Sequence, residues 1–373
     1  MKKLLALLCL VTIGYAAGGA AAAPPPSVDA KAWIVEYGNG QVLASSNAES
    51  PRAIASITKL MTVMVVLEHH KLSDVITVDP RAAAVGQESI DLVAGEQLTV
   101  ADLVRGALIQ SANDAADALA LGTSPDWLAF ANLMNAKAAQ LGLDNTHFVR
   151  PDGLDAPGEY STAADVTLLA RDAMKIPFIR ETVGTQVAYI AGGRTLHTWN
   201  DLLGVVPGVI GVKTGHTDKA GWCQVVAATQ GTTTVYATIL GSPSRQRRDA
   251  DLERLVSWGL GVYTIVPAIL ADHAYAEVAL PYGRSPLALY AGTALHAIVR
   301  PGRQLTEKVV APRFAQLPVK RGQVLGRIEI WLGPHLVGER PLVASRSVAS
   351  PDLAGRVGWY AHRTLHDIEG LFT

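Results

Sequence analysis

The spacing of apolar residues predicts an antiparallel sheet with helices packed against it over residues 28–267. Short apolar runs flank the turn at 38–40 and longer ones flank Gln230-Gly231, so each pair of runs predicts a β-hairpin. Elsewhere in this region the apolar residues follow a helical period. The expected strands are 33–35, 41–43, 222–229 and 232–240, and the expected helices are 56–70, 104–109, 115–121, 130–141, 164–174 and 248–260. Hairpins in place of strand–helix–strand repeats indicate an α+β fold rather than a parallel doubly wound sheet.

A different pattern begins after Pro267. Short apolar runs recur at regular spacing and are separated by glycine and proline. The runs are 276–280, 287–290, 297–299, 308–310 and 327–331. Such spacing is typical of a small β-sandwich. We therefore expect an α+β domain at 24–267, followed by an all-β domain at 268–346.

Residues 1–23 have the pattern of a secretory signal peptide. Lys2 and Lys3 precede an apolar run at 4–13, and small residues follow it. A transmembrane anchor is the alternative, but the apolar run is too short to span a bilayer comfortably. Cleavage would remove Cys9 and leave Cys223 as the remaining cysteine, so we expect no internal disulfide.

The last residues, 347–373, contain the pattern of an amphipathic helix. Apolar side chains fall on one helical face and charged side chains lie around the other. The apolar face comprises Leu353, Val357, Tyr360, Ala361, Thr364, Ile368, Leu371 and Phe372. The pattern leaves two interpretations open, a helix that lies in a membrane interface and a C-terminal helix docked on its own domain.

Composition narrows the classes of function. The 373 residues are 49% apolar and 17% charged with a formal net charge of −1, which is ordinary for a globular protein. No basic face for nucleic acid is indicated. The histidines do not pair at ligand spacing except for His69-His70, which point apart on a helix. No glycine-rich phosphate-binding loop follows a strand, so we expect neither a metal nor another cofactor.

Ser56 and Lys59 form the first of three motifs with catalytic chemistry. Ser56 stands at the expected start of a helix, where backbone N–H groups and the helix dipole favour negative charge on an attacked carbonyl oxygen. Lys59 follows one turn later on the same face, so its amine can reach Ser56 Oγ. Burial and a nearby cation such as Lys213 would lower the pKa of Lys59 and allow it to act as a base.

The second motif is Ser111-Ala112-Asn113, in a break expected between two helices. Two residues apart in a non-helical turn, the side chains of Ser111 and Asn113 can face one cleft. We expect Ser111 to carry a proton between Lys59 and the leaving amine, and Asn113 to bind a substrate amide. Asn113 can also cap the helix that follows.

The third motif, Lys213-Thr214-Gly215, is expected on a strand. Gly215 lets a peptide pass close to the strand edge, and Lys213 with Thr214 offers charge and donors to a terminal carboxylate. The backbone N–H of His216 is the expected second donor to the oxyanion. Several arginines follow the second hairpin, and among them we choose Arg248 as a bidentate clamp on the carboxylate.

In this order, the three motifs resemble those of the D-alanyl-D-alanine carboxypeptidase family, the low-molecular-weight penicillin-binding proteins, which attack D-Ala-D-Ala peptides or β-lactams through a serine. The resemblance covers about residues 28–267. The matching segments are 55–62, 111–116, 141–148, 153–155 and 213–221. More loosely, the β-domain and the amphipathic tail resemble the membrane-associated branch of this family.

The resemblance implies a β-lactamase/transpeptidase-like fold, with a helical lobe beside the sheet. It also implies a serine carboxypeptidase that removes the terminal D-Ala from peptidoglycan pentapeptides through an acyl-Ser56 intermediate. β-Lactam antibiotics would acylate the same serine, and the tail would dock on the periplasmic face of the bacterial inner membrane. Three positions depart from the family pattern. Asp152 replaces a histidine and Trp199 a basic residue of some members, and Cys223 lies just beyond the third motif.

Other functions share parts of this pattern. A D,D-endopeptidase that acts on cross-linked peptidoglycan has the same motifs and differs in substrate. A class A β-lactamase carries an aspartate at the position of Ala112 and a loop glutamate that activates water; neither is recognisable here, and the β-domain argues further against it. A non-catalytic wall-binding protein is expected to lack Ser56, Lys59 or Lys213, and all three are present.

Overall fold

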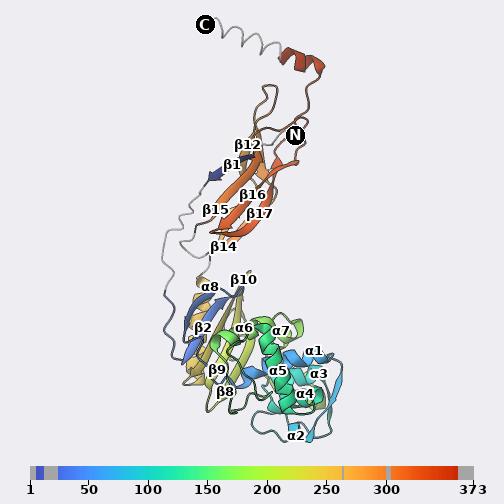
Figure 1. Ribbon diagram of the computed structural model, residues 1–373, viewed down its shortest axis with the longest axis vertical. Coiled ribbons are helices and arrows are strands. Elements are labelled where there is room, and N and C mark those ends of the chain that lie inside the picture. The colour runs from blue at the N-terminus through green and yellow to red at the C-terminus, as the bar shows by residue number, and fades with distance from the viewer. Residues whose placement is uncertain (1–5, 12–23, 263, 300–303, 360–373) are drawn as a thin grey trace. The chain divides into compact units, whose positions relative to one another are not determined.

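The computed structural model describes the protein except for residues 1–5, 12–23, 263, 300–303 and 360–373 (Figure 1). The chain divides into two compact units. We call Ala23–Gly261 the N-terminal unit, and Val262–Thr373 together with Met1–Ala22 the C-terminal unit. The N-terminal unit combines a sheet with helices and the C-terminal unit is rich in strands, which confirms the expected fold class.

A five-stranded antiparallel sheet lies at the centre of the N-terminal unit, in the order β3-β2-β10-β9-β8. Its strands are β2 (Ala32–Tyr37), β3 (Val42–Ser46), β8 (Val209–Thr217), β9 (Gly221–Gln230) and β10 (Thr233–Ser242). Both predicted hairpins are present, as β2–β3 and β9–β10. Alternate residues of β9 belong to two different apolar clusters, one with α6 (Ala163–Ala173) and one with α8 (Arg245–Gly261). The sheet is therefore covered on both faces, which explains its nearly continuous apolar sequence.

The remaining helices form a lobe beside this sheet (Figure 1). They are the 3₁₀ turn η1 (Ala55–Thr58), α1 (Lys59–His69), α2 (Pro80–Ala83), α3 (Val100–Leu108), α4 (Asn113–Thr123), α5 (Trp127–Leu141) and α7 (Pro177–Val183), with the short 3₁₀ turn η2 (Ala191–Gly193). Two small hairpins complete the unit, β4 (Val75–Thr77) with β5 (Gln97–Thr99) and β6 (Val187–Ile190) with β7 (Arg194–His197). Helix α1 is buried from Lys59 to Val66, which fits its apolar residues on all sides.

Local geometry near the second motif differs from the expectation. Asn113 is the first residue of α4 rather than part of a non-helical turn, because the extended residue Ala112 is the N-cap. The carboxylate of Asp114 accepts hydrogen bonds from the backbone N–H groups of Ile90, Leu92 and Ala115. The helix consequently starts earlier than its apolar pattern, and the break between the helices is short.

A six-stranded antiparallel sheet dominates the C-terminal unit, in the order β1-β15-β16-β17-β13-β12, with β11 and β14 as a separate pair. The strands are β1 (Ala6–Val11), β11 (Thr264–Ile269), β12 (Ala274–Val278), β13 (Leu287–Ala291), β14 (Leu295–Val299), β15 (Thr306–Pro312), β16 (Val324–Leu332) and β17 (His335–Ala344). Buried aliphatic side chains such as Leu289, Ile328 and Leu342 form its core.

The described residues at the two ends of the chain include one strand and one short helical segment. Strand β1 lies within the expected leader and pairs with β15 along its full length. Helical structure is described at 353–359, where Leu353 and Val357 are exposed and Trp359 packs edge-on against Tyr282. The remaining residues of the expected amphipathic tail lie outside the described part of the chain.

Candidate active site

Ser56 lies in the 3₁₀ turn η1, immediately before α1. Its neighbours Ala55 and Ile57 are buried, whereas Ser56 itself is partly exposed. Ala55 has a positive φ of 50°, an unfavourable conformation for a residue with a side chain. Strain of this kind is frequent where a reactive side chain must be held in one orientation.

Lys59 is fully buried and its Nζ donates to three acceptors. These are Ser56 Oγ at 2.8 Å, Asn113 Oδ1 at 2.7 Å and the carbonyl oxygen of Asp152 at 2.6 Å. Burial lowers the pKa of Lys59 to about 8, although the nearby carboxylates of Asp152 and Asp117 act in the opposite direction. A substantial fraction of Lys59 can therefore lose its proton near neutral pH, as a base for Ser56 requires.

Ser111 and Lys213 form a second buried pair in the same site. Lys213 Nζ donates to Ser111 Oγ at 2.8 Å and to the carbonyl oxygen of Thr214 at 3.0 Å. Burial, followed by the charge of Lys59, holds the pKa of Lys213 well below its usual range. Ser111 has a positive φ of 64°. The structure thus forms two hydrogen-bonded pairs from the motifs, Ser56 with Lys59 and Ser111 with Lys213.

Asn113 is engaged by the protein at both ends of its side-chain amide. Its Oδ1 accepts from Lys59, and its Nδ2 donates to the carbonyl oxygen of Gly86 at 3.1 Å. The expectation was that this amide binds substrate. In the described geometry it orients Lys59 and fixes the loop around Gly86.

Two glycines allow the backbone to close around the nucleophile. A Cβ on Gly215 of β8 would lie 2.8 Å from the carbonyl oxygen of Ile54 and 3.1 Å from the backbone nitrogen of Ser56. A Cβ on Gly153, which has a φ of +78°, would lie 2.2 Å from the carbonyl oxygen of Ala55. Both distances are too short for a side chain. The edge of β8 can therefore approach the amide of Ser56.

The cationic part of the site comes from the first turn of α8. Arg248 is 2% exposed, donates to Asp249 at 2.6 and 2.8 Å, and lies over the ring of Trp222 at 5.6 Å. Arg245 is half-buried, pairs with both carboxylate oxygens of Asp201 at 2.5 and 2.6 Å, and lies over Trp199. The predicted Arg248 and its neighbour Arg245 both line the cavity, and three arginines in four residues cannot be told apart by sequence alone.

A cluster of buried carboxyl groups lies behind Lys59, and the motifs do not include it. Asp117 is fully buried, and neither carboxylate oxygen has a hydrogen-bond partner within the described part of the chain. Burial, with a contribution from Asp152, raises its pKa to about 8. Burial also raises the pKa of Glu159 to about 7, although Thr58 Oγ1 donates to it at 3.1 Å. In the sequence, the one sign of this cluster is an aspartate, Asp117, among the alanines of helix α4.

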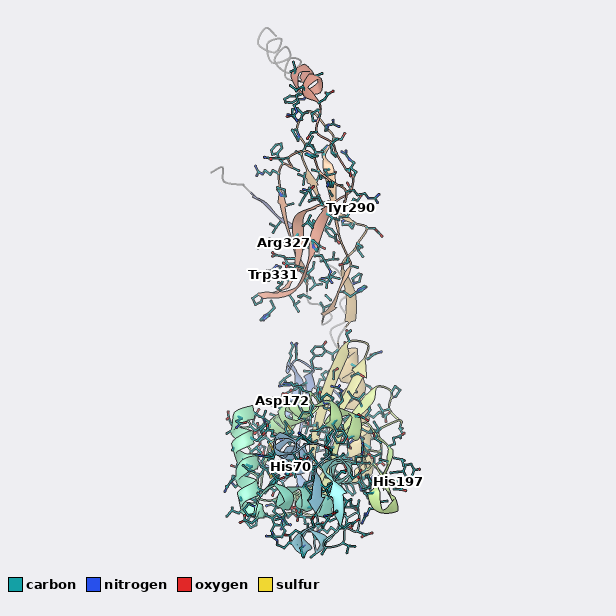
Figure 2. All side chains as sticks on the ribbon, turned by 90° about the vertical axis from the view of Figure 1, so that its right-hand side faces the viewer. His70, Asp172, His197, Tyr290, Arg327 and Trp331 are labelled. Atoms are coloured by element: carbon teal, nitrogen blue, oxygen red, sulfur yellow. The ribbon has the colours of Figure 1, made fainter. Side chains whose placement is uncertain are left out.

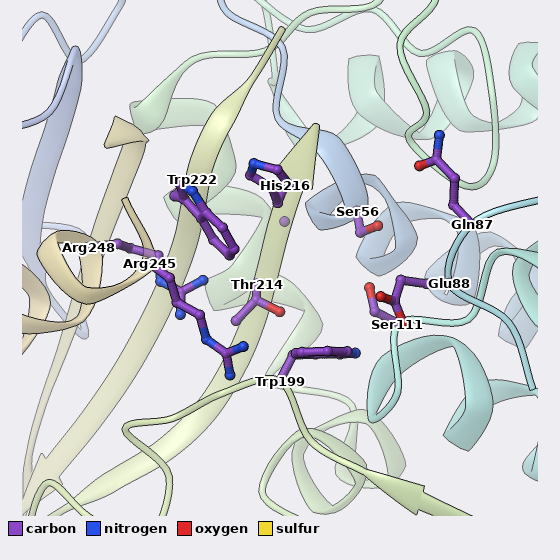
Figure 3. A pocket seen from close by; sticks show the side chains of 11 residues that line it. Ser56, Gln87, Glu88, Ser111, Trp199, Thr214, His216, Trp222, Arg245 and Arg248 are labelled. Carbon is purple, nitrogen blue, oxygen red and sulfur yellow. The ribbon is translucent and has the colours of Figure 1, made fainter. Parts of the chain in front are cut away.

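Ser56 and Ser111 face a cavity of about 290 Å³ (Figure 3). Its lining residues are Ser56, Gln87, Glu88, Ser111, Trp199, Thr214, Gly215, His216, Trp222, Arg245 and Arg248. The ring of His216 stacks on Trp222 at 4.0 Å, which fixes the end of β8. The site can therefore hold a short peptide between a serine nucleophile with its base and a cationic wall.

Other kinds of site find little support in the described residues. Among the residues that the structure describes, no group of three His, Cys, Asp or Glu side chains could hold a metal ion. None of the helices built from the described residues has both the length and the hydropathy needed to cross a bilayer.

Comparisons with known proteins agree with this geometry. Residues 19–244 match the family model of the D-alanyl-D-alanine carboxypeptidases, and residues 271–350 match that of the penicillin-binding protein 5 C-terminal domain. The chain is 34% identical to D-alanyl-D-alanine carboxypeptidase DacC of Escherichia coli, over 91% of this chain and 90% of that protein. It is 35% identical to a D-alanyl-D-alanine carboxypeptidase of Streptomyces, over 62% of this chain and 86% of that one. Among solved structures, penicillin-binding protein 5 from Haemophilus influenzae superposes with a TM-score of 0.65 at 26% identity, covering 88% of this chain and all of that one.

Proposed function

Since the chain belongs to the D-alanyl-D-alanine carboxypeptidase family, we propose that its reaction proceeds through an acyl-enzyme on Ser56. The protein is a serine D-Ala-D-Ala carboxypeptidase and a low-molecular-weight penicillin-binding protein of peptidoglycan processing. One observation carries the assignment of the nucleophile. It is the 2.8 Å hydrogen bond between the fully buried amine of Lys59 and Ser56 Oγ.

Acylation begins when neutral Lys59 takes the proton of Ser56 Oγ, which then attacks the carbonyl carbon between the two D-alanines. The backbone N–H groups of Ser56 and His216 stabilise the oxyanion, a placement supported by the close approach of β8 at Gly215. The tetrahedral intermediate collapses and the bond to the terminal D-Ala breaks. The leaving nitrogen receives a proton from Lys59 through the hydroxyl of Ser111.

Hydrolysis of the acyl-enzyme reverses these roles. Neutral Lys59 takes a proton from an incoming water, whose oxygen attacks the ester carbonyl. The bond from the carbonyl carbon to Ser56 Oγ then breaks, Lys59 returns the proton to Oγ, and the shortened peptide leaves as a carboxylic acid. Asn113 and the carbonyl oxygen of Asp152 keep the amine of Lys59 in place through both steps. The same acylation by a β-lactam ring gives a penicillin adduct on Ser56.

The terminal carboxylate of the substrate is assigned to the cationic wall. Thr214 lines the cavity there, beside Arg245 and Arg248. Lys213 directly precedes Thr214 on β8, and its amine donates to Ser111 Oγ. Trp199, at the position where some members carry a basic residue, lines the cavity beside Arg245, whose guanidinium lies over its ring.

Mass spectrometry tests the nucleophile. The purified protein is incubated with a pentapeptide that ends in D-Ala-D-Ala, and separately with a penicillin. We expect loss of one D-Ala from the peptide and a penicillin adduct on Ser56. Ser56→Ala should abolish the adduct, while Ser257→Ala, on the exposed side of α8, should retain it.

Three results would contradict the proposal. A covalent adduct on the Ser56→Ala protein would remove the nucleophile from Ser56. Rapid penicillin hydrolysis without an adduct, with the peptide untouched, would indicate a β-lactamase. Cleavage of cross-linked muropeptide dimers in place of the pentapeptide would indicate an endopeptidase.

We also propose that the protein is exported and lies peripherally on the periplasmic face of the inner membrane. The leader pattern of residues 1–23 and the amphipathic pattern of the tail support this. Cleavage of the leader would remove β1 and leave β15 as an edge strand. Deletion of residues 353–373 should move the protein into the soluble fraction, and continued membrane association would count against the tail as an anchor.

A further inference from the structure

The active-site cavity has two electrical poles. Arg245 and Arg248 line one side, and Glu88 lines the other, next to Ser111 (Figure 3). Ser56 lies between them (Figure 3). Under the proposed function, the substrate carboxylate occupies the cationic side and the scissile carbonyl lies at Ser56. The acyl part of the peptide must then continue toward the side of Gln87 and Glu88.

The backbone of Glu88 is held firmly by the second motif. Its carbonyl oxygen accepts from the backbone N–H of Asn113 at 2.7 Å. On either side, the carbonyl oxygen of Gly86 accepts from Asn113 Nδ2 and that of Ser89 accepts from Gln110 Nε2, both at 3.1 Å. A loop fixed at three successive points presents its side chain in a preorganised position.

In contrast to its backbone, the carboxylate of Glu88 is available for a ligand. The side chain is exposed, and it has no hydrogen bond or ion pair with any described residue. It is close enough to the catalytic lysines to oppose, through its charge, the burial that lowers the pKa of Lys59 and of Lys213. An unpaired carboxylate on a fixed backbone, at the mouth of a peptide site, favours a cation on the bound peptide.

We propose that Glu88 forms a specificity subsite for a side-chain amino group on the residue that precedes the terminal D-Ala-D-Ala. The subsite rests on the proposed function, because the direction of the bound peptide follows from it. The recognised group is a primary ammonium that donates to the Glu88 carboxylate while the terminal carboxylate lies at the opposite pole.

Two peptides of one sequence test the subsite. Both carry a lysine before D-Ala-D-Ala, one with its side-chain amine free and the other with the amine acetylated. We expect kcat/KM of the wild-type protein to favour the free amine by about three- to five-fold, the range for a partly exposed ion pair. Glu88→Gln should bring this ratio close to one, and Glu88→Lys should reverse it.

The ratio separates recognition of the amine from a general effect on the lysines. A change in the charge near Lys59 and Lys213 alters both peptides alike and cancels in the ratio. Glu253→Gln is the matched control, an exposed glutamate on α8 whose removal should leave the preference unchanged.

Each outcome has one meaning. An unchanged preference in Glu88→Gln, an equal loss on both peptides, or no preference in the wild-type protein would overturn the subsite and leave the proposed function intact. Failure of the wild-type protein to release D-Ala from either peptide would overturn the proposed function, and the subsite with it.

Discussion

The two units of this protein differ in how many charged side chains their described residues bury. The N-terminal unit buries the cations Lys59, Lys213 and Arg248, each exposed by 2% or less, together with the carboxyl groups of Asp117 and Asp152. Most of these groups surround one serine. The free energy of burying them is unfavourable by several kcal/mol per ion before compensation.

The described core of the C-terminal unit is aliphatic. The buried charged residues known there are Glu307 and Glu329. Glu329 accepts from Arg327 Nε at 2.7 Å and from Trp331 Nε1 at 3.1 Å along the same face of β16, where Figure 2 labels both donors. Glu329 is therefore a buried carboxylate with hydrogen-bond partners on its own strand, and burial raises the pKa of the other one, Glu307.

The contrast shows which unit bears the larger free-energy cost of burying charged groups. Hydrogen bonds and opposite charges offset part of the cost in the N-terminal unit, but Asp117 has no partner among the described residues and keeps its cost. Its unfavourable environment coincides with the machinery around Lys59. The described part of the C-terminal unit buries fewer charged residues, although burial raises the pKa of Glu307 there as well.

The largest effect is expected from removal of the buried base. Lys59→Ala should slow acylation by penicillin about 10³-fold, since general base catalysis contributes about 10² to 10⁴. In the wild-type protein, acylation should increase as pH rises through about 8, the value to which burial lowers the pKa of Lys59. Adduct formation measured over a range of pH checks both effects.

Lys175→Ala serves as the control, because Lys175 pairs with Asp172 at the exposed surface. It should leave both the rate and the pH profile unchanged. A wild-type acylation rate that does not depend on pH would contradict the role of Lys59 as a base.

Two left-handed glycines sharpen the comparison between the units. Gly153 and Gly322 have φ values of +78° and +82°, but a Cβ meets the carbonyl oxygen of Ala55 at the first position and no atom within 4 Å at the second. Gly322→Ala should cost about 1 kcal/mol from backbone strain alone. Gly153→Ala should cost roughly 1–3 kcal/mol more through overpacking, and should also slow acylation. Urea unfolding and the acylation rate measure the two effects, and equal costs at both positions would refute the steric argument.

Truncation of an aliphatic core residue tests whether stability and chemistry are separable. Ile328→Ala, at a fully buried position of β16, should lower the free energy of unfolding of the C-terminal unit by about 2–5 kcal/mol. Acylation should remain within about two-fold of wild type. The matched change Ile57→Ala, at a fully buried position beside Ser56, should lower the free energy of unfolding of the N-terminal unit and also slow acylation. Loss of acylation in Ile328→Ala would show that the active site depends on the C-terminal core.

The smallest effect concerns the pH dependence of stability. The pKa of Asp117 is raised to about 8 by burial, so the folded state keeps a proton that the unfolded state has released. Stability from this group is therefore present at low pH and lost as pH rises from about 4 to about 8. Asp117→Asn should be more stable than wild type at pH 8, on the order of 1–3 kcal/mol, and should gain less at pH 5.

Urea midpoints at the two pH values provide the measurement. Burial also raises the pKa of Glu159, to about 7, and this residue is present in both proteins as an internal reference. A wild-type protein whose midpoint falls no more steeply with pH than that of Asp117→Asn would show that Asp117 is ionised when folded.

Local spacing made part of the site predictable. Ser56 and Lys59 are one helical turn apart, so their contact followed from helix geometry. The motif of Lys213 was correctly assigned to a strand for a similar reason. The fold class followed from the two hairpins and from the change of pattern after Pro267.

Contacts between distant segments were not predictable in this way. Asp117 and Glu159 reach Lys59 from α4 and from a loop, and no period in the sequence joins them. The engagement of Asn113 by Gly86 depends on the path of a loop. The pairing of β1 with β15 could not be inferred either, because the composition of a leader carries no strand register.

Cys223 has a consequence for experiments on this enzyme. It lies on β9 directly opposite Gly215 of β8, is fully buried, and burial raises the pKa of its thiol to about 11. A thiol reagent can therefore reach it only when the packing around this part of the sheet opens. With the leader removed, it is the single sulfhydryl group of the chain. Its rate of alkylation then measures how often this part of the catalytic sheet opens, and no label has to be introduced into the protein.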